Sequence, residues 1–196
     1  TTLKDEPNTE AAKNITNNEL LTHTSGIADP FELGRRKPGE DYSTPKSTFP
    51  LFADAPLTIK PGTRHLYSNG NYAVLAAIVE EISGMSFENY IEENIFRPVG
   101  MGFGNPNEYK NLPKAIRYSH SAVNDPLALK PVSPVADSAN DIQFEYSGYS
   151  NGYLTTEDVY KFMYSLREGK LLSKEMVELL TAGKVNVEEG MPVKYA

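Results

Sequence analysis

The sequence predicts a mainly α-helical chain with long loops and few, short strands. Apolar residues recur at helical spacing in several segments, and a Ser, Thr or Asn that can cap a helix precedes each of them. The stretches between them, above all 29–56 and 119–150, contain many prolines and turn residues but few periodic apolar side chains. Within them we expect only a helical turn around 49–52; a short strand is expected near 115–118.

Composition limits the classes of protein and partner. The 196 residues suffice for one substantial domain or part of a larger one, and 39% hydrophobic with 23% charged residues is ordinary for a soluble globular chain. A net charge of -7 without a basic cluster argues against nucleic acid and anionic membranes as partners. No apolar run is long enough for a membrane span. The lack of cysteine excludes disulfides, thiolate nucleophiles and Cys-based zinc sites.

The longest predicted helix follows the stretch 61–72. Asn69 is a good N-cap for it, and Gly84 can end it in the left-handed conformation. We expect this helix to be the most buried element of the chain. Its apolar stripe, predicted to face inward, comprises Leu75, Ile78, Val79 and Ile82.

Four shorter helices are predicted around it. The first begins at a capping box in which Glu19 reaches back to Thr16. Ser86 begins the second, which should end at Pro98. The run 155–158 begins the third, and a Ser caps the fourth at position 173. The buried stripe predicted for the third helix comprises Val159, Phe162, Met163 and Leu166.

Tyr67 and Asn69, at the start of the longest helix, form a candidate catalytic corner. There the helix dipole and free backbone N–H groups favour a developing negative charge, and a phenol and a carboxamide on such a loop can point the same way. Spacing alone favours a plainer interpretation, in which Tyr67 packs against the core and Asn69 merely caps the helix. Ser68 between them would need a nearby base and an oxyanion hole to act as a nucleophile, and no Gly-x-Ser-x-Gly pattern is present.

Three stretches, in order along the chain, resemble the serine β-lactamase-related hydrolases, which include class C β-lactamases, D-alanyl-D-alanine carboxypeptidases and related esterases. Residues 20–27 resemble the family's Leu-Leu-x-His-Thr-Ser-Gly stretch. Residues 61–101 resemble its Tyr-x-Asn loop and the helices up to a Pro-x-Gly-Met turn, and 150–158 resemble a later loop that opens a helix. The resemblance implies the helical-domain portion of the α+β serine β-lactamase/transpeptidase fold.

The resemblance also implies a chemistry: hydrolysis of an amide, β-lactam or ester through a serine acyl-enzyme, with a small molecule or cell-wall peptide as substrate. Tyr67 would carry protons between the serine and the leaving group, which requires a pKa lowered by a nearby cation. Asn69 would bind the acyl-side amide of the substrate and steady a lysine. The resemblance implies no metal or organic cofactor, and it implies an extracytoplasmic bacterial location. The family's structural turn corresponds to His23, Thr24, Ser25 and Gly26.

Two further family motifs are expected outside these residues. In the family, a Ser-x-x-Lys helix lies upstream of the His-Thr-Ser-Gly stretch and a Lys/His-x-Gly strand lies downstream. We therefore expect 1–196 to be a single, truncated helical domain that lacks its flanking α/β portions and is inactive alone. The face left by a missing sheet would favour self-association. Ser43-Thr44-Pro45-Lys46 matches Ser-x-x-Lys in form, but the internal Pro45 and the order of motifs argue against a nucleophile there.

A non-catalytic binding or scaffold module on the same helical fold is the alternative function. A Ser-x-x-Lys motif in the upstream part of the gene would favour the enzyme over this alternative. The histidines at positions 23, 65 and 120 are too scattered to indicate a metal site. His65 could flank the site, but a position at the surface is favoured.

Overall fold

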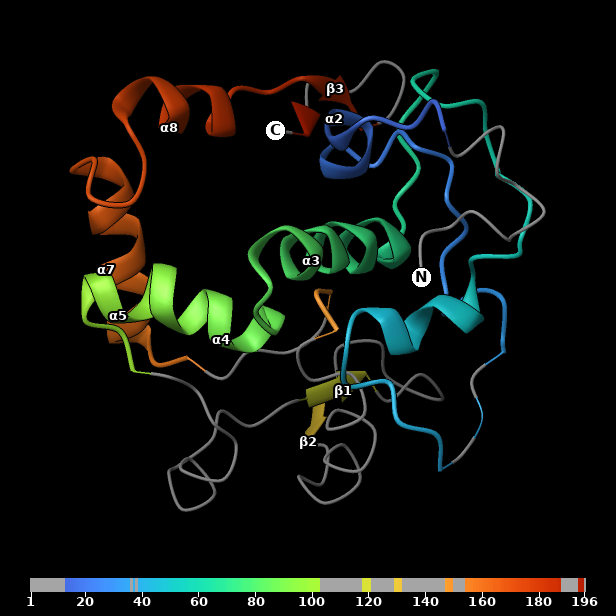
Figure 1. Ribbon diagram of the computed structural model, residues 1–196, viewed down its shortest axis with the longest axis horizontal. Helices are drawn as coiled ribbons and strands as arrows, with labels where there is room; N and C mark the ends of the chain where they lie inside the picture. The colour runs from blue at the N-terminus through green and yellow to red at the C-terminus, as the bar shows by residue number, and fades with distance from the viewer. Residues whose placement is uncertain are drawn as a thin grey trace.

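The computed structural model describes residues 13–35, 37, 39–102, 118–120, 129–131, 147–149, 154–187 and 194–195. Their regular structure is mostly helical, as predicted, with two short hairpins. Helix α3 (Asn69–Ser83) lies at the centre of Figure 1, and α2 (Asn17–Leu21) packs beside it. Between them in sequence comes the 3-10 helix η2 (Lys46–Leu51), close to the helical turn that was predicted there.

The predicted capping box starts α2. The Thr16 hydroxyl accepts a hydrogen bond from the Glu19 backbone N–H at 3.3 Å, and the Glu19 carboxylate accepts from the Thr16 backbone N–H at 2.7 Å. Both free N–H groups at the helix start are thereby satisfied. This local signal was sufficient to locate the helix from sequence.

Helix α3 begins one residue away from the predicted cap. Ser68, in an extended conformation, is the N-cap, and its hydroxyl accepts from the Gly70 backbone N–H at 3.1 Å. The same hydroxyl donates to the carbonyl oxygen of Ala28 at 3.1 Å, a tertiary contact that Asn69 does not make. The prediction of Asn69 as the cap is therefore wrong, whereas Gly84 ends the helix as predicted, with a φ of 70°.

The buried side of α3 consists of small residues. Gly70 approaches its neighbours so closely that an added Cβ would lie 3.0 Å from the Ile27 side chain. The predicted inward stripe is wrong at Ile82, which is 82% exposed, while Leu75 and Ile78 pack against the core only in part. A stripe chosen by hydrophobicity alone overlooks small side chains that permit close helix packing. The fully buried positions of α3 are Gly70, Asn71, Ala73, Val74, Ala76 and Ala77.

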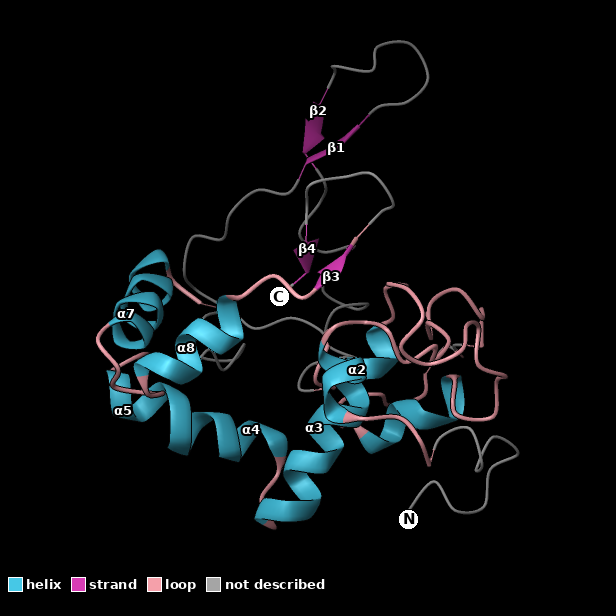
Figure 2. Ribbon diagram, turned by 90° about the horizontal axis from the view of Figure 1, so that it is seen from above, coloured by secondary structure: helices cyan, strands magenta, loops and turns pink. Residues whose placement is uncertain are grey.

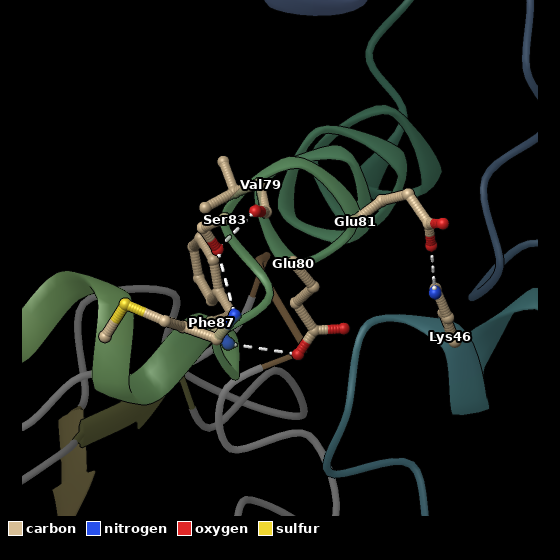
Figure 3. A network of polar contacts seen from close by, with 7 residues as sticks. Lys46, Val79, Glu80, Glu81, Ser83 and Phe87 are labelled. Carbon is tan, nitrogen blue, oxygen red and sulfur yellow. Dashed lines mark hydrogen bonds and ion pairs between the residues drawn. The ribbon is translucent and has the colours of Figure 1, made fainter.

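Side-chain contacts at the end of α3 position the next helix, α4 (Phe87–Ile91), which begins at the predicted cap. Figure 3 shows the Glu80 carboxylate accepting from the Phe87 backbone N–H at 3.0 Å. On another face of α3, the Glu81 carboxylate pairs with the Lys46 ammonium at 2.8 Å and so joins α3 to η2.

The helix that starts at α4 ends within one residue of the predicted position, although it changes its winding on the way. A π-helical turn, η3 (Glu92–Phe96), and then α5 (Arg97–Val99) extend it to Gly100, where φ is 69°. The helix thus ends at Val99, one residue after Pro98, with Gly100 as its left-handed cap.

Two capped helices follow near the C-terminal end, α7 (Thr156–Arg167) and α8 (Lys174–Thr181), and both begin where predicted. The buried residues of α7 are polar, Asp158 and Ser165, so the predicted apolar stripe is not the buried one. Several large apolar side chains on the two helices are exposed. They are Val159, Tyr160, Met163, Tyr164, Met176, Leu179 and Leu180.

The described strands form two antiparallel hairpins, which lie to one side of the helices in Figure 2. Strand β1 (Tyr118–His120) pairs with β2 (Leu129–Pro131), and β3 (Val185–Asn186) pairs with β4 (Lys194–Tyr195). The strand expected near 115–118 thus touches β1 only at its last residue, and its other residues lie outside the described ones. Within the described residues, no helix has both the length and the apolar character that crossing a bilayer requires.

Candidate active site

The turn His23–Gly26 is locked against the segment that leads to α3. The carbonyl oxygen of Gly26 accepts from the backbone N–H of Thr58 at 2.8 Å and from its hydroxyl at 3.0 Å. Gly26 has a φ of 81°, and a Cβ at this position would overlap the carbonyl oxygen of Ile59. Glycine fits both the left-handed backbone and the close approach, which explains why the turn contains it.

His23 is the buried centre of the site, with 1% of its surface exposed. Its Nδ1 accepts from the Ser68 backbone N–H at 3.3 Å and from the Asn71 amide at 3.1 Å. The ring proton must then be on Nε2, which donates to the Tyr195 hydroxyl at 3.2 Å. Burial and the neighbouring His65 lower the pKa of His23 from 6.5 to about 4. At neutral pH this imidazole is therefore uncharged.

Ser25 and Asn71 connect the turn to α3. The Ser25 hydroxyl donates to Asn71 Oδ1 at 2.5 Å and accepts from the Ile27 backbone N–H at 3.0 Å. Both polar side chains are fully buried, each with 0% exposure. A buried polar group is costly unless it is hydrogen-bonded, so this network fixes how the start of α3 sits on the turn.

The structure brings Tyr67 and Asn69 together above this buried network. The Tyr67 hydroxyl donates to Asn69 Oδ1 at 3.1 Å, and the Tyr67 ring lies against the His23 ring with centroids 4.4 Å apart. Tyr67 is 56% exposed, so it is a surface-accessible group on a buried support. The plainer interpretation, in which Tyr67 packs against the core, is thus correct only in part. The ring packs on His23, whereas the hydroxyl bonds to Asn69.

The pKa of Tyr67 is shifted in the direction opposite to the one that a proton-transfer role requires. Partial burial and the proximity of Tyr195 and Asp29 raise the pKa of this phenol. The sequence-based mechanism required a cation to lower it. Among the described residues, no cation contributes to the shift.

Asp29 is a site residue that the sequence did not single out. Its Oδ2 accepts from both the backbone N–H and the side-chain amide of Asn69, each at 2.7 Å. Its Oδ1 accepts from the Phe31 backbone N–H at 2.8 Å, and only 8% of the residue is exposed. Asp29 precedes Asn69 by 40 positions and opens a stretch that reads as irregular loop, so the only sequence signal was an acidic residue shortly after the turn.

The other candidates occupy different environments. His65 is not a surface residue, since its Nε2 is buried and has no hydrogen-bond partner among the described residues. Its ring packs on those of His23 and Tyr195, with centroids 5.8 and 5.3 Å away.

Ser68 is 1% exposed and its hydroxyl serves the cap, which argues against a nucleophile. Lys46, the lysine of the Ser-x-x-Lys look-alike, is paired with Glu81 at the surface.

Nothing in the described part of the chain gathers three or more His, Asp or Glu side chains around a point that could hold a metal ion. The groups that this corner presents are a phenol and a carboxamide, because the backbone N–H groups of residues 68–70 already donate hydrogen bonds within the chain.

A comparison with protein families matches residues 3–192 to the family described as Beta-lactamase. A putative penicillin-binding protein, PbpX, of Bacillus subtilis (strain 168) is 32% identical over 175 residues, which cover 88% of this chain and 40% of that protein. A putative D-alanyl-D-alanine carboxypeptidase of Escherichia coli (strain K12) is 38% identical over 101 residues, covering 50% of this chain and 23% of that protein.

A solved structure, a penicillin-binding protein from Bacillus halodurans, superposes with a TM-score of 0.68 at 28% identity, covering 100% of this chain and 59% of that one. Together these findings define the class: the fold is β-lactamase/transpeptidase-like. Since the family match covers nearly all residues, the chain belongs to the β-lactamase family. It spans less than half of the length of the two relatives compared by sequence.

Proposed function

We propose that the protein containing this chain is a serine hydrolase that cleaves an amide, β-lactam or ester bond through an acyl-enzyme. The observation that carries the proposal is the exposed hydroxyl of Tyr67 donating to Asn69 at the start of α3, in a chain of this family. The substrate class that we propose is a cell-wall peptide, a β-lactam or a related ester. One relative bears the name of a putative D-alanyl-D-alanine carboxypeptidase, which supports that class.

In this proposal Tyr67 transfers protons between the nucleophilic serine and the leaving group. Its pKa is raised by burial and by Asp29, so the active site needs a cation to bring that pKa back down. The lysine of a Ser-x-x-Lys motif outside these 196 residues would supply that cation. Asn69 would contact the same lysine and the acyl-side amide of the substrate. The turn His23–Gly26 serves as the rigid support beneath them.

We further propose that the chain is the helical portion of an α+β protein. The share of its relatives that it spans supports this, because 41% of the solved Bacillus halodurans chain lies outside the match, which covers 59%. The exposed apolar side chains of α7 and α8 support it as well, since such a face is normally covered in a soluble protein. Taken alone, the 196 residues would be inactive and would self-associate through that face. The names of the relatives favour a location of the protein in the bacterial cell envelope or outside the cell.

The test is Tyr67→Phe in the full-length protein, with acylation by labelled penicillin or a fluorophosphonate as the readout. The substitution removes only the hydroxyl, so we expect the melting temperature to stay at about the parental value. Acylation should slow by roughly 10²–10⁴-fold. Tyr160→Phe is the matched control, because Tyr160 is 66% exposed on α7 and takes no part in the site. It should acylate at the parental rate.

A Tyr67→Phe protein that folds normally and acylates within a factor of about two of the parent would remove Tyr67 from the mechanism. The alternative is a non-catalytic binding module, which the raised pKa of Tyr67 would suit. Such a module would bind penicillin reversibly or not at all. Failure of the unaltered full-length protein to form any covalent adduct would favour it.

A further inference from the structure

Asp29 holds Asn69 by two atoms at once. One carboxylate oxygen accepts from the backbone N–H and from the side-chain amide of Asn69, both at 2.7 Å. The other oxygen is fixed by the Phe31 backbone N–H at 2.8 Å. Such short bonds to an ionised carboxylate are among the stronger hydrogen bonds in proteins. Nothing in the proposed chemistry requires this buried carboxylate, so its place beside the site needs an explanation.

The contact between Asp29 and Asn69 determines which way the Asn69 carboxamide points. An ionised carboxylate can only accept hydrogen bonds, so the atom of Asn69 that faces Asp29 must be the amide nitrogen. The amide oxygen then faces the other way, where the Tyr67 hydroxyl donates to it at 3.1 Å. If the carboxamide were turned over, its oxygen would face the carboxylate and its NH2 group would face Tyr67.

We propose that Asp29 is a positioning residue of the active site, which locks the Asn69 carboxamide so that its oxygen stands beside the Tyr67 hydroxyl. The inference rests on the proposed function and specifies what the corner can bind. The oxygen is an acceptor, so the group that meets it carries a donor: an ammonium, or the N–H of an acyl-side amide. A free carboxamide would present its NH2 group part of the time and repel an ammonium.

A purely structural role for Asp29 makes a different prediction. A carboxylate near the start of α3 also stabilises the helix through its free N–H groups, whatever the side chain at position 69. In that case removing the charge would lower stability but would affect acylation no more in the parent than in a protein without the Asn69 amide. Coupling between the two residues in the acylation rate therefore separates the two roles.

The experiment compares Asp29→Asn, Asn69→Ala and the double variant in the full-length protein, with the labelled-penicillin acylation rate and the melting temperature measured on each. We expect Asp29→Asn to slow acylation about 10- to 100-fold, the usual effect of misplacing a catalytic group. In the Asn69→Ala background the same change should alter the rate by less than about twofold, since there is no carboxamide left to orient. Glu32→Gln, an exposed charge removal nearby in the sequence, is the control and should change nothing.

Several outcomes would overturn the inference, and they are distinguishable from failure of the proposed function. If Asn69→Ala is slow but Asp29→Asn is not, or if Asp29→Asn costs the same in both backgrounds, Asp29 does not act through Asn69. If Asn69→Ala acylates at the parental rate, the proposed role of Asn69 fails and the inference with it.

A second measurement does not depend on turnover. The side-chain NH2 protons of Asn69 should resonate downfield through their bond to Asp29, and Asp29→Ala, which leaves no acceptor there, should abolish that shift. An unchanged NH2 signal in Asp29→Ala would overturn the orientation argument even in a protein that shows no acylation.

Discussion

Two regions of this molecule are held in opposite ways. Around the turn His23–Gly26, polar side chains that are far apart in the sequence are buried and bonded to one another, such as Ser25 to Asn71 across 46 positions. In α7 and α8 the capping hydrogen bonds are local, as in the capping box of Thr155 and Asp158, and large apolar side chains stay exposed. One long-range bond joins α7 to the rest of the chain, from the Gly102 backbone N–H to the Asp158 carboxylate at 2.9 Å. In the first region most buried polar groups bond to one another, His65 Nε2 excepted, and the second region has an exposed apolar surface.

The difference shows which region can hold side chains in a precise geometry. A pair of side chains such as the proposed site residues Tyr67 and Asn69 is held in a precise geometry by a buried polar network, because each misplaced polar group is costly. Local caps determine where a helix begins but not which element packs on it. The corner therefore lies on the interlocked region, whereas α7 and α8 present exposed apolar side chains.

The largest effect should come from Gly26→Ala. The new Cβ would overlap the carbonyl oxygen of Ile59 in a left-handed backbone, so we expect a loss of about 3–5 kcal/mol in unfolding free energy. Gly34→Ala is the matched control: φ there is 61°, but nothing lies within 4 Å of the added Cβ. It should cost only the backbone strain, about 1–2 kcal/mol. Denaturant unfolding of the full-length protein measures both, and equal losses would show that the turn is not locked.

A smaller effect is the pH dependence that His23 imposes. Its pKa is about 4 in the folded protein against 6.5 ordinarily, so the unfolded chain takes up the proton first as the pH falls. The stability that this residue contributes is complete above pH 6.5 and is lost on the way down to 4, a change on the order of 3 kcal/mol.

The measurement is the unfolding free energy at pH 7 and pH 4 for the parent and for His23→Asn. Asparagine is chosen because it tolerates the positive φ of 52° at this position. Titrating carboxylates act on both proteins alike, so the parent should lose more stability over this range than the variant does. Parallel losses would mean that His23 is not held neutral by burial, and the contrast between the two regions would weaken.

The smallest effect is expected for Thr155→Ala on α7. The Thr155 hydroxyl accepts from the Asp158 backbone N–H at 3.1 Å and donates to the Asp158 carboxylate at 2.7 Å. Loss of this cap should cost about 1 kcal/mol, and Thr155→Ser should restore most of it. Thermal unfolding measures both. A loss as large as that of Gly26→Ala would show that α7 is tied into the fold as firmly as the turn.

The sequence located helix starts well and helix surfaces poorly. Thr16, Ser86 and Ser173 were identified as caps, and the run 155–158 as a helix start, because the partner of a capping hydroxyl lies within three residues. At α3 two neighbours could cap, and the choice fell on Ser68 because its hydroxyl also reaches Ala28. The exposed Ile82 and the buried Ala73 show that hydrophobicity by itself did not indicate which face of α3 is covered.

By itself, then, the sequence determined the helical character of the chain, the starts of its helices, its family and the proximity of Tyr67 to Asn69. The tertiary structure alone decided which groups support that pair. His23 and Asp29 accept hydrogen bonds from residues at the start of α3 that are 40 to 48 positions away in the sequence. Contacts of that range have no periodicity and no fixed spacing, so they exist only once the chain has folded and burial has made each unsatisfied polar group costly.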